Sequence, residues 1–248
     1  MQTRSLPDYY AELAPFADLF RQGQAILCYH KIAKPPKHAR IKGLYLDPAL
    51  FSRQMEELSS RGFASDPPGR PDGTAKNRFT ISFDDGFLNN LTEALPRMQK
   101  SNLRAINYLV ADRLGQTSDW EGREGGEADP LMSESQIKEW LSAGHWIGAH
   151  TCTHPRLSRL SREQAKEEIF SSKKKLEDRF GIPVEHFAYP YGDYNQITVE
   201  LVRSAGFKTA CTMHRGINLP ATSLFELKRW TARYPSRNLR NLLRKLFG

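Results

Sequence analysis

The sequence predicts an α/β fold with a mainly parallel sheet and helices outside it. Two observations predict this class. Short apolar runs alternate with longer amphipathic segments, and reactive polar residues follow directly after several of the apolar runs. In parallel α/β folds the chemistry lies at the carboxyl ends of the strands, so the second observation agrees with the first. Six or seven strand–helix units in 248 residues fit an open or incomplete barrel better than a flat sheet.

Strands are predicted wherever a short run of apolar and β-branched residues is bounded by turn residues or charges. The first run, AILCYH at 25–30, is apolar almost throughout and predicts a buried strand. The other predicted strands span 78–83, 104–110, 145–149, 184–189, 207–212 and 225–231.

Helices are predicted where apolar residues recur at helical spacing after a capping signal. Asp47, followed by proline, supplies one such signal, and capping boxes of the Ser-x-x-Gln kind begin at Ser133 and Ser161. Residues 115–130, rich in Gly, Asp and Glu, are expected to form a long loop. The predicted helices span 48–61, 87–101, 133–143, 161–180, 196–205 and 235–247, with Pro96 as a weak point of the second.

Composition excludes several classes of protein. The hydrophobic residues make up 39% of the chain, enough for a full core, and no stretch approaches the ~18 apolar residues of a membrane span. The three cysteines are widely separated and odd in number, which predicts buried, reduced thiols. The first 24 residues lack the basic-then-apolar layout of a secretory signal, so we expect a cytoplasmic protein.

The net charge of +8 is concentrated in two stretches, residues 31–42 and 228–248, and such clusters attract phosphate groups. A solvated face is the simpler explanation. Within 238–248 the leucines form an apolar stripe flanked by basic residues, which predicts either a peripheral contact with the inner face of the membrane or a helix that packs on the barrel. No nucleic-acid motif accompanies the charge, so no nucleic-acid partner is expected. The chain divides into an N-terminal extension (1–24), one α/β domain (25–230) and a basic amphipathic C-terminal segment (231–248).

The residues that follow the predicted strands include the donor set of a metal site. Asp84 and Asp85 end one strand, and His150 and His154 follow another. Two histidines four residues apart, joined by a carboxylate from elsewhere, form a metal site with open positions for water and substrate. The neighbouring carboxylate can then take a proton from a metal-activated water. The alternatives are histidines that pack in the core and an Asp pair that caps a helix.

Two further sites follow later strands. Tyr191 lies in a Tyr-Pro-Tyr-Gly turn, where its backbone N–H can donate to a tetrahedral oxyanion, although the turn alone is only an aromatic turn. His214 can protonate a leaving amine, since imidazole titrates near neutrality, or can be an ordinary surface histidine.

The assembled motifs resemble those of the polysaccharide deacetylase family, the NodB-homology group of carbohydrate esterases. The likeness rests on FDDG at 83–86, HTCTH at 150–154 and FAYPYG at 187–192, with His214 after a late strand, and it covers roughly residues 25–230. It implies an incomplete (β/α)7 barrel and metal-dependent hydrolysis of an N-acetyl group from an amino sugar, either in a free polymer or on a carrier.

The resemblance also implies a role for each site residue. Asp85, His150 and His154 would hold a divalent metal, expected to be zinc. Asp84 would be the general base, the Tyr191 amide would stabilise the oxyanion, and His214 would be the general acid. His30, Tyr189 and Arg229 are expected to contact substrate.

The chain departs from the family pattern at two places. Ala188 occupies a position where family members often carry an arginine that steadies the base, and Arg229 at the end of the last strand is the candidate to replace it. No Asp-x-x-Asp-Trp motif follows the third motif, and Asp119-Trp120 comes too early in the chain to serve. These departures keep a non-catalytic glycan- or lipid-binding protein of the same fold as the alternative function. A hydrolase of formyl or non-sugar amides is a further possibility.

Overall fold

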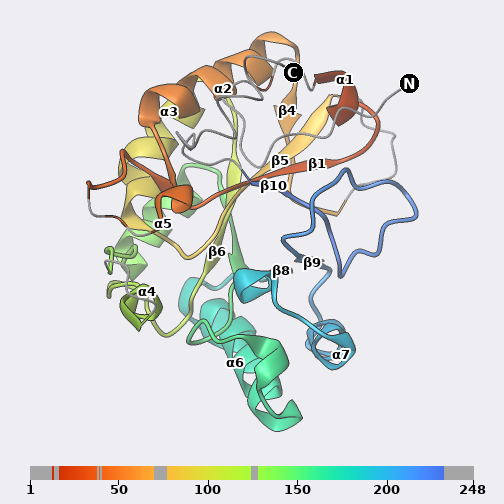
Figure 1. Ribbon diagram of the computed structural model, residues 1–248. Coiled ribbons are helices and arrows are strands. Elements are labelled where there is room, and N and C mark those ends of the chain that lie inside the picture. The colour runs from red at the N-terminus through yellow and green to blue at the C-terminus, as the bar shows by residue number, and fades with distance from the viewer. Residues whose placement is uncertain are drawn as a thin grey trace.

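The computed structural model describes residues 13, 17–37, 39, 41–69, 77–123 and 128–231. Their main sheet has eight strands in the order β10-β1-β5-β6-β7-β8-β9, with β4 beside β5, and all neighbours are parallel. The fold is therefore the predicted incomplete (β/α)7 barrel (Figure 1). The strands are β1 (Ala25–Tyr29), β4 (Ala64–Ser65), β5 (Arg78–Phe83), β6 (Ala105–Leu109), β7 (Trp146–Ala149), β8 (His186–Ala188), β9 (Thr209–Cys211) and β10 (Trp230–Thr231).

The helices surround the sheet on its outside (Figure 1). They are α1 (Ala17–Phe20), α2 (Pro48–Ser60), α3 (Leu95–Lys100), α4 (Asp119–Arg123), α5 (Glu134–Ser142), α6 (Arg162–Phe180) and α7 (Gln196–Ser204). Short helical turns are η2 (Lys42–Leu44), η3 (Asn90–Ala94), η4 (Leu157–Arg159) and η5 (Pro190–Gly192). A separate two-stranded sheet pairs β2 (Lys31–Ile32) with β3 (Tyr45–Leu46).

The predicted capping signals begin the helices at the expected residues. The carboxylate of Asp47 accepts the backbone N–H of Ala49, and complete capping boxes form at Ser133 and Ser161. The predicted helix 87–101 forms without a break but is irregular before Pro96. The π-helical segment η3 runs directly into α3, and Pro96 lies in the first turn of α3, where its missing N–H is tolerated.

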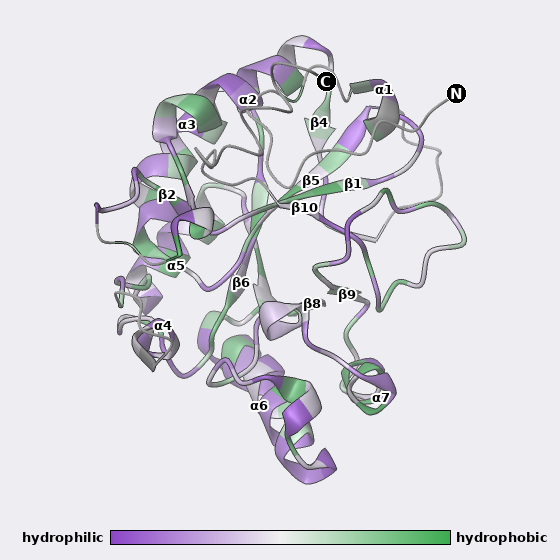
Figure 2. Cartoon of the chain, in the orientation of Figure 1, coloured by the Kyte–Doolittle hydropathy of each residue, from purple (hydrophilic) through white to green (hydrophobic). Residues whose placement is uncertain are grey.

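The strands separate two apolar clusters. Ala105 and Leu109 of β6 belong to the large core between the sheet and the helices, whereas Ile106 and Tyr108 face the barrel interior with Cys211 and other small apolar residues. The interior is narrow: a Cβ added at Gly148 would lie 2.5 Å from the Tyr108 ring, so the glycine gives this ring its space. Figure 2 shows the contrast between mainly hydrophobic β1 and the hydrophilic surface of α6.

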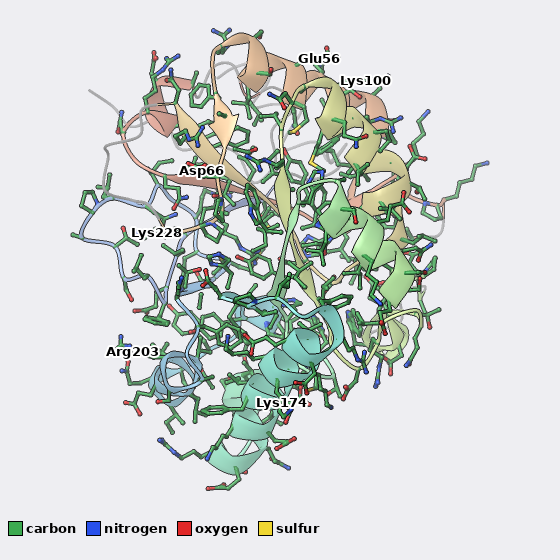
Figure 3. The ribbon with its side chains drawn as sticks, turned by 180° about the vertical axis from the view of Figure 1, so that it is seen from behind. Glu56, Asp66, Lys100, Lys174, Arg203 and Lys228 are labelled. Carbon is green, nitrogen blue, oxygen red and sulfur yellow. The ribbon has the colours of Figure 1, made fainter. Side chains whose placement is uncertain are left out.

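The outermost groups on the helices are charged. Lys174 on α6 and Arg203 on α7 are exposed, and Figure 3 labels both among the side chains that surround the sheet. The three cysteines are buried and free, as predicted. No helix among the described residues is long and apolar enough to cross a bilayer.

The described residues of the predicted N-terminal extension 1–24 contact the α/β domain. Phe20 is buried against Trp230, and Gln24 pairs with Asn218 in a β-bridge. The predicted loop 115–130 contains α4, a helix too short to show a periodic pattern. The predicted helix 235–247 and the predicted membrane contact through 238–248 lie outside the described residues.

Candidate active site

A cavity of about 380 Å³ opens at the carboxyl ends of the parallel strands, where the sequence predicted the chemistry. It contains both residues of the Asp pair and both histidines of the HTCTH motif. Its lining is His30, Ile41, Gly43, Leu44, Asp84, Asp85, Trp120, Glu121, His150, His154, Arg156, Tyr191, Met213 and Thr231. The size is that of a small-molecule site.

Asp85, His150 and His154 form a buried cluster whose ligand atoms lie within 4.8 Å of one another. Oδ1 of Asp85 is 3.5 Å from Nε2 of His150 and 3.2 Å from Nε2 of His154. The cluster is the only group of three or more potential metal ligands among the described residues. The structure therefore brings together the three residues that the sequence predicted to be ligands.

The chemistry of these donors fits a metal ion. Oδ1 of Asp85 is buried and has no hydrogen-bond partner in the described part of the chain, a costly arrangement that a cation would relieve. Nδ1 of His150 is 2.7 Å from the carbonyl oxygen of Ala188 and donates its proton there, so Nε2 keeps a lone pair for a metal. Burial lowers the pKa of His150 to about 4, so its imidazole is neutral at pH 7, as a metal ligand must be. One carboxylate oxygen and two imidazole nitrogens are a donor set typical of zinc.

Asp84, next to the cluster, is held by Arg229. Nη1 and Nη2 of Arg229 donate to the two carboxylate oxygens at 2.6 and 2.8 Å, and its Nε donates to the carbonyl oxygen of Thr212 at 2.8 Å. Burial alone would raise the pKa of Asp84, but the charge and hydrogen bonds of Arg229 hold that pKa well below its usual range. Asp84 is thus a rigid, ionised carboxylate. Position 188, where family members often carry an arginine, is alanine here, and Arg229 makes the contact with Asp84 instead.

The backbone around the cluster adopts a conformation that L-residues rarely use. Asp85, Thr151, His154 and Tyr191 all have φ between 60° and 75°, in the left-handed region. Such residues cluster at functional sites, where the surrounding structure must hold them. For the HTCTH loop, that support comes from a carboxylate on α6.

Glu168 supplies this support. Its Oε2 accepts the backbone N–H groups of Cys152 and Thr153 at 2.8 and 2.9 Å, and its Oε1 accepts the Thr153 hydroxyl at 2.6 Å. The loop that carries His150 and His154 is therefore fixed to α6 by three hydrogen bonds to one charged group. No sequence pattern predicts the role of Glu168, because its contacts join residues fifteen and sixteen positions apart.

Aromatic rings enclose the cluster on its open side. The Trp120 ring stacks on His154 at 4.5 Å, and the Tyr191 ring lies 4.6 Å from His154 on another side. The guanidinium of Arg156 lies 3.9 Å over the Tyr191 ring. Asp119-Trp120 comes early in the chain, as the sequence shows, but α4 still brings Trp120 to the cavity.

The other predicted residues have different outcomes. His30 lines the cavity, with Nε2 3.8 Å from Oδ2 of Asp84. His214 is exposed and lies against Tyr194, outside the cavity lining, because the chain beyond β9 directs its neighbour Met213 to the cavity instead. Tyr189 is fully buried and donates its hydroxyl to the carbonyl oxygen of Phe225.

Neither Tyr189 nor Arg229, both predicted to contact substrate, is among the residues that line the cavity. The Tyr189 side chain belongs to the core, and Arg229 is 1% exposed and occupied by Asp84. The sequence does not distinguish an aromatic or basic side chain that is buried in the core from one that lines the cavity, because both kinds occur at strand ends.

An incomplete parallel barrel with a buried cluster of metal-ligating residues at the carboxyl ends of its strands defines the class of the protein as an α/β barrel with a candidate metal centre. Residues 72–210 match the profile of the family described as polysaccharide deacetylase. The chain belongs to the polysaccharide deacetylase family.

Individual relatives agree with this membership. The chain is 26% identical over 211 residues to YxkH of Bacillus subtilis, which is named as a putative polysaccharide deacetylase. The match covers 82% of this chain and 69% of YxkH. It is 22% identical over 134 residues to the peptidoglycan-N-acetylglucosamine deacetylase PgdA of Listeria monocytogenes, which covers 54% of this chain and only 25% of that enzyme. The structure of the deacetylase PplD of Streptococcus pyogenes, solved in complex with acetate, matches with a TM-score of 0.74 at 26% identity. The match covers 91% of this chain and 99% of the PplD chain.

Proposed function

We propose that the protein removes the N-acetyl group from an amino sugar in a glycan, with a divalent metal, expected to be zinc, at Asp85, His150 and His154. The observation that carries this proposal is the adjacency of that buried cluster to a second, clamped carboxylate, Asp84, in one cavity. A metal ion that activates water and an ionised carboxylate beside it that accepts the proton together suit the hydrolysis of an amide.

The residues of the chain divide the work as follows. A metal held by the cluster would polarise the acetamide carbonyl and lower the pKa of the attacking water. Asp84, ionised and oriented by Arg229, accepts the proton of that water. The backbone N–H of Tyr191, in the turn beside His154, donates to the oxyanion of the tetrahedral intermediate.

The departing amine needs a proton donor, and we assign this role to His30 in place of His214. His30 lines the cavity beside Asp84, whereas the exposed imidazole of His214 lies outside the lining. A general acid must come within hydrogen-bond reach of the leaving nitrogen, which a group in the cavity can do. The bond from carbon to nitrogen breaks as this proton is delivered, and acetate and a free amino sugar result.

The substrate class follows from the relatives and the cavity. PgdA is named for the N-acetylglucosamine of peptidoglycan. The cavity of about 380 Å³ has room for a single sugar unit at the cluster. We therefore propose an N-acetylglucosamine unit, in a polymer or on a carrier, as the group that is deacetylated.

The test measures acetate release by zinc-loaded protein from chitin oligosaccharides, peptidoglycan fragments and a nucleotide-linked N-acetylglucosamine. Asp84→Asn should reduce kcat by about 100-fold or more, and His150→Ala should also remove stoichiometric zinc. His30→Ala should lose about 100-fold, whereas His214→Ala, whose side chain is exposed, should stay within about threefold of wild type. No release by the wild type from any of these sugars, or full activity of Asp84→Asn, contradicts the proposal.

A non-catalytic glycan- or lipid-binding protein of the same fold is the alternative. The contacts of Arg229 with Asp84 and of Trp120 with His154 favour the hydrolase over it. Protein that binds the sugar but holds no stoichiometric zinc and releases no acetate would support the alternative.

A further inference from the structure

The cavity contains another carboxylate, Glu121, that has no part in the reaction described above. It lies on α4 directly after Trp120, lines the cavity and is only 5% exposed. The sequence placed this residue in a loop with no assigned purpose. A carboxylate this deeply enclosed requires a partner, and the structure shows one.

The partner is Lys31, a lysine that is 2% exposed. Its Nζ lies 2.7 Å from Oε2 of Glu121, and the Ser118 hydroxyl donates to the same oxygen at 2.7 Å. Nζ also lies 2.6 Å from Oδ2 of Asp129 and over the ring of Phe87 at 4.6 Å. Glu121 is therefore fixed in one orientation by a buried cation and a hydroxyl, both acting on one of its two oxygens.

The other oxygen, Oε1, is left available. It has no hydrogen-bond partner in the described parts of the chain. Oδ1 of Asp85 is among the fully buried atoms without a partner, whereas Oε1 of Glu121 is not. Glu121 lines the cavity, and Oε1 is its one carboxylate oxygen that neither Lys31 nor Ser118 contacts by a hydrogen bond. A buried ion pair gives little net stability, so its rigid placement at a cavity wall calls for a functional reason.

The local surroundings indicate what Oε1 accepts. The Lys31 ammonium pairs with both Glu121 and Asp129, so this ion cluster keeps one net negative charge, and Oε1 is a strong acceptor for a hydroxyl donor. Apolar side chains of Trp120 and Leu44 line the same cavity. A fixed acceptor beside apolar and aromatic surface suits a pyranose ring, which carries hydroxyl groups at its edge and C–H groups on its faces.

We propose that Glu121 Oε1 accepts hydrogen bonds from ring hydroxyls of the amino sugar whose acetamide lies at the Asp85 cluster, and that Lys31 positions this carboxylate. The inference rests on the proposed deacetylase function and adds to it a specificity-determining residue. It makes recognition of the sugar separable from cleavage of the acetyl group.

The chain offers a matched control for the test. Asp129 pairs with the same Lys31 but does not line the cavity, so Asp129→Asn removes one carboxylate from the same ion cluster without touching the ligand. Glu121→Gln leaves Lys31 paired with Asp129, so the variant keeps a counter-ion for the buried lysine and should fold. Each variant is checked by thermal unfolding and by zinc content.

The measurement is the ratio of two kcat/KM values, one for a chitin pentasaccharide and one for an activated aryl acetate that has no sugar. In Glu121→Gln this ratio should fall about 10- to 100-fold, mainly through KM, which is the effect of losing a hydrogen bond to a charged acceptor. In Asp129→Asn the ratio should stay within about threefold of wild type.

The outcomes are distinguishable. An unchanged ratio in Glu121→Gln, or an equal fall in Asp129→Asn, overturns the inference and assigns the ion pair a structural role. Wild-type protein that cleaves the aryl acetate but no N-acetylated sugar refutes the proposed function, and this inference with it.

Discussion

Replacing Arg229 by methionine breaks the buried ion pair that holds Asp84. The guanidinium makes two charge-assisted hydrogen bonds to this carboxylate, at 2.6 and 2.8 Å, and both residues are at most 2% exposed. Methionine fills much of the same volume but leaves a buried carboxylate without a counter-ion. Breaking a buried pair in this way destabilises a protein by about 3–5 kcal/mol, and two such hydrogen bonds at about 1.5–3 kcal/mol each give a similar figure.

A double-mutant cycle separates this pair from the other contacts of Arg229. Arg229→Met also removes the hydrogen bond to the carbonyl oxygen of Thr212, so the single variant overstates the pair. Asp84→Asn leaves Arg229 buried and unpaired, and should itself destabilise the fold. In Arg229→Met/Asp84→Asn neither charge remains, so the double variant should be more stable than the sum of the singles predicts, by about 2–4 kcal/mol.

The assay is urea unfolding at pH 7 in the presence of a chelator, so that metal binding does not contribute to the free energy of unfolding. The slope of each transition should match that of the wild type. The reasoning would be refuted if the double variant's loss of unfolding free energy equals the sum of the two single losses to within about 0.5 kcal/mol, because independent sites behave in that way. In the wild type, Asp84 has a lowered pKa, so its contribution is present above the unfolded pKa, about 3.9, and is lost as the pH falls below it.

Two further predictions concern groups outside the cavity. Glu168→Gln should weaken zinc binding about 10-fold in a chelator competition, because it loosens the loop at Cys152 and Thr153. The control is Glu167→Gln, a change at the exposed neighbouring residue, which should bind zinc as the wild type does. Equal zinc affinity of the two variants would contradict the role of Glu168. Burial lowers the pKa of His145 to about 4, and its Nδ1 accepts a backbone N–H, so the unfolded chain takes up the proton first as the pH falls through 6.5. Between pH 7 and 5 the wild type should therefore lose about 2 kcal/mol more stability than His145→Gln, measured by urea unfolding, and identical pH slopes would exclude this.

Much of the fold could be predicted because local signals agreed with the tertiary structure. The capping boxes at Ser133 and Ser161 begin their helices at the expected residues, and the strand ends gave the location of the cavity. Helix α4 was missed because five residues are too few to show a period.

The candidate site could be predicted only where its residues are adjacent in the sequence or follow a strand. The Asp pair and the HTCTH motif meet these conditions, and the structure brings them together. The contact of Glu121 with Lys31 spans 90 positions, and no local pattern predicts it. The contact of Arg229 with Asp84 spans 145 positions and could be predicted only because both residues lie at strand ends. His214 was chosen for its place after a strand, but a position after a strand does not fix the side to which a residue points.

The left-handed residues around the cluster have a consequence for protein engineering. The positions of Asp85, Thr151, His154 and Tyr191 depend on the left-handed conformation of their main chain as well as on their side chains. Grafting the same side chains onto a scaffold with ordinary helical or extended backbone would aim them in other directions. A design that reuses this site must therefore first copy the loops that carry these residues. It must also copy Glu168 of α6, which holds the 150–154 loop.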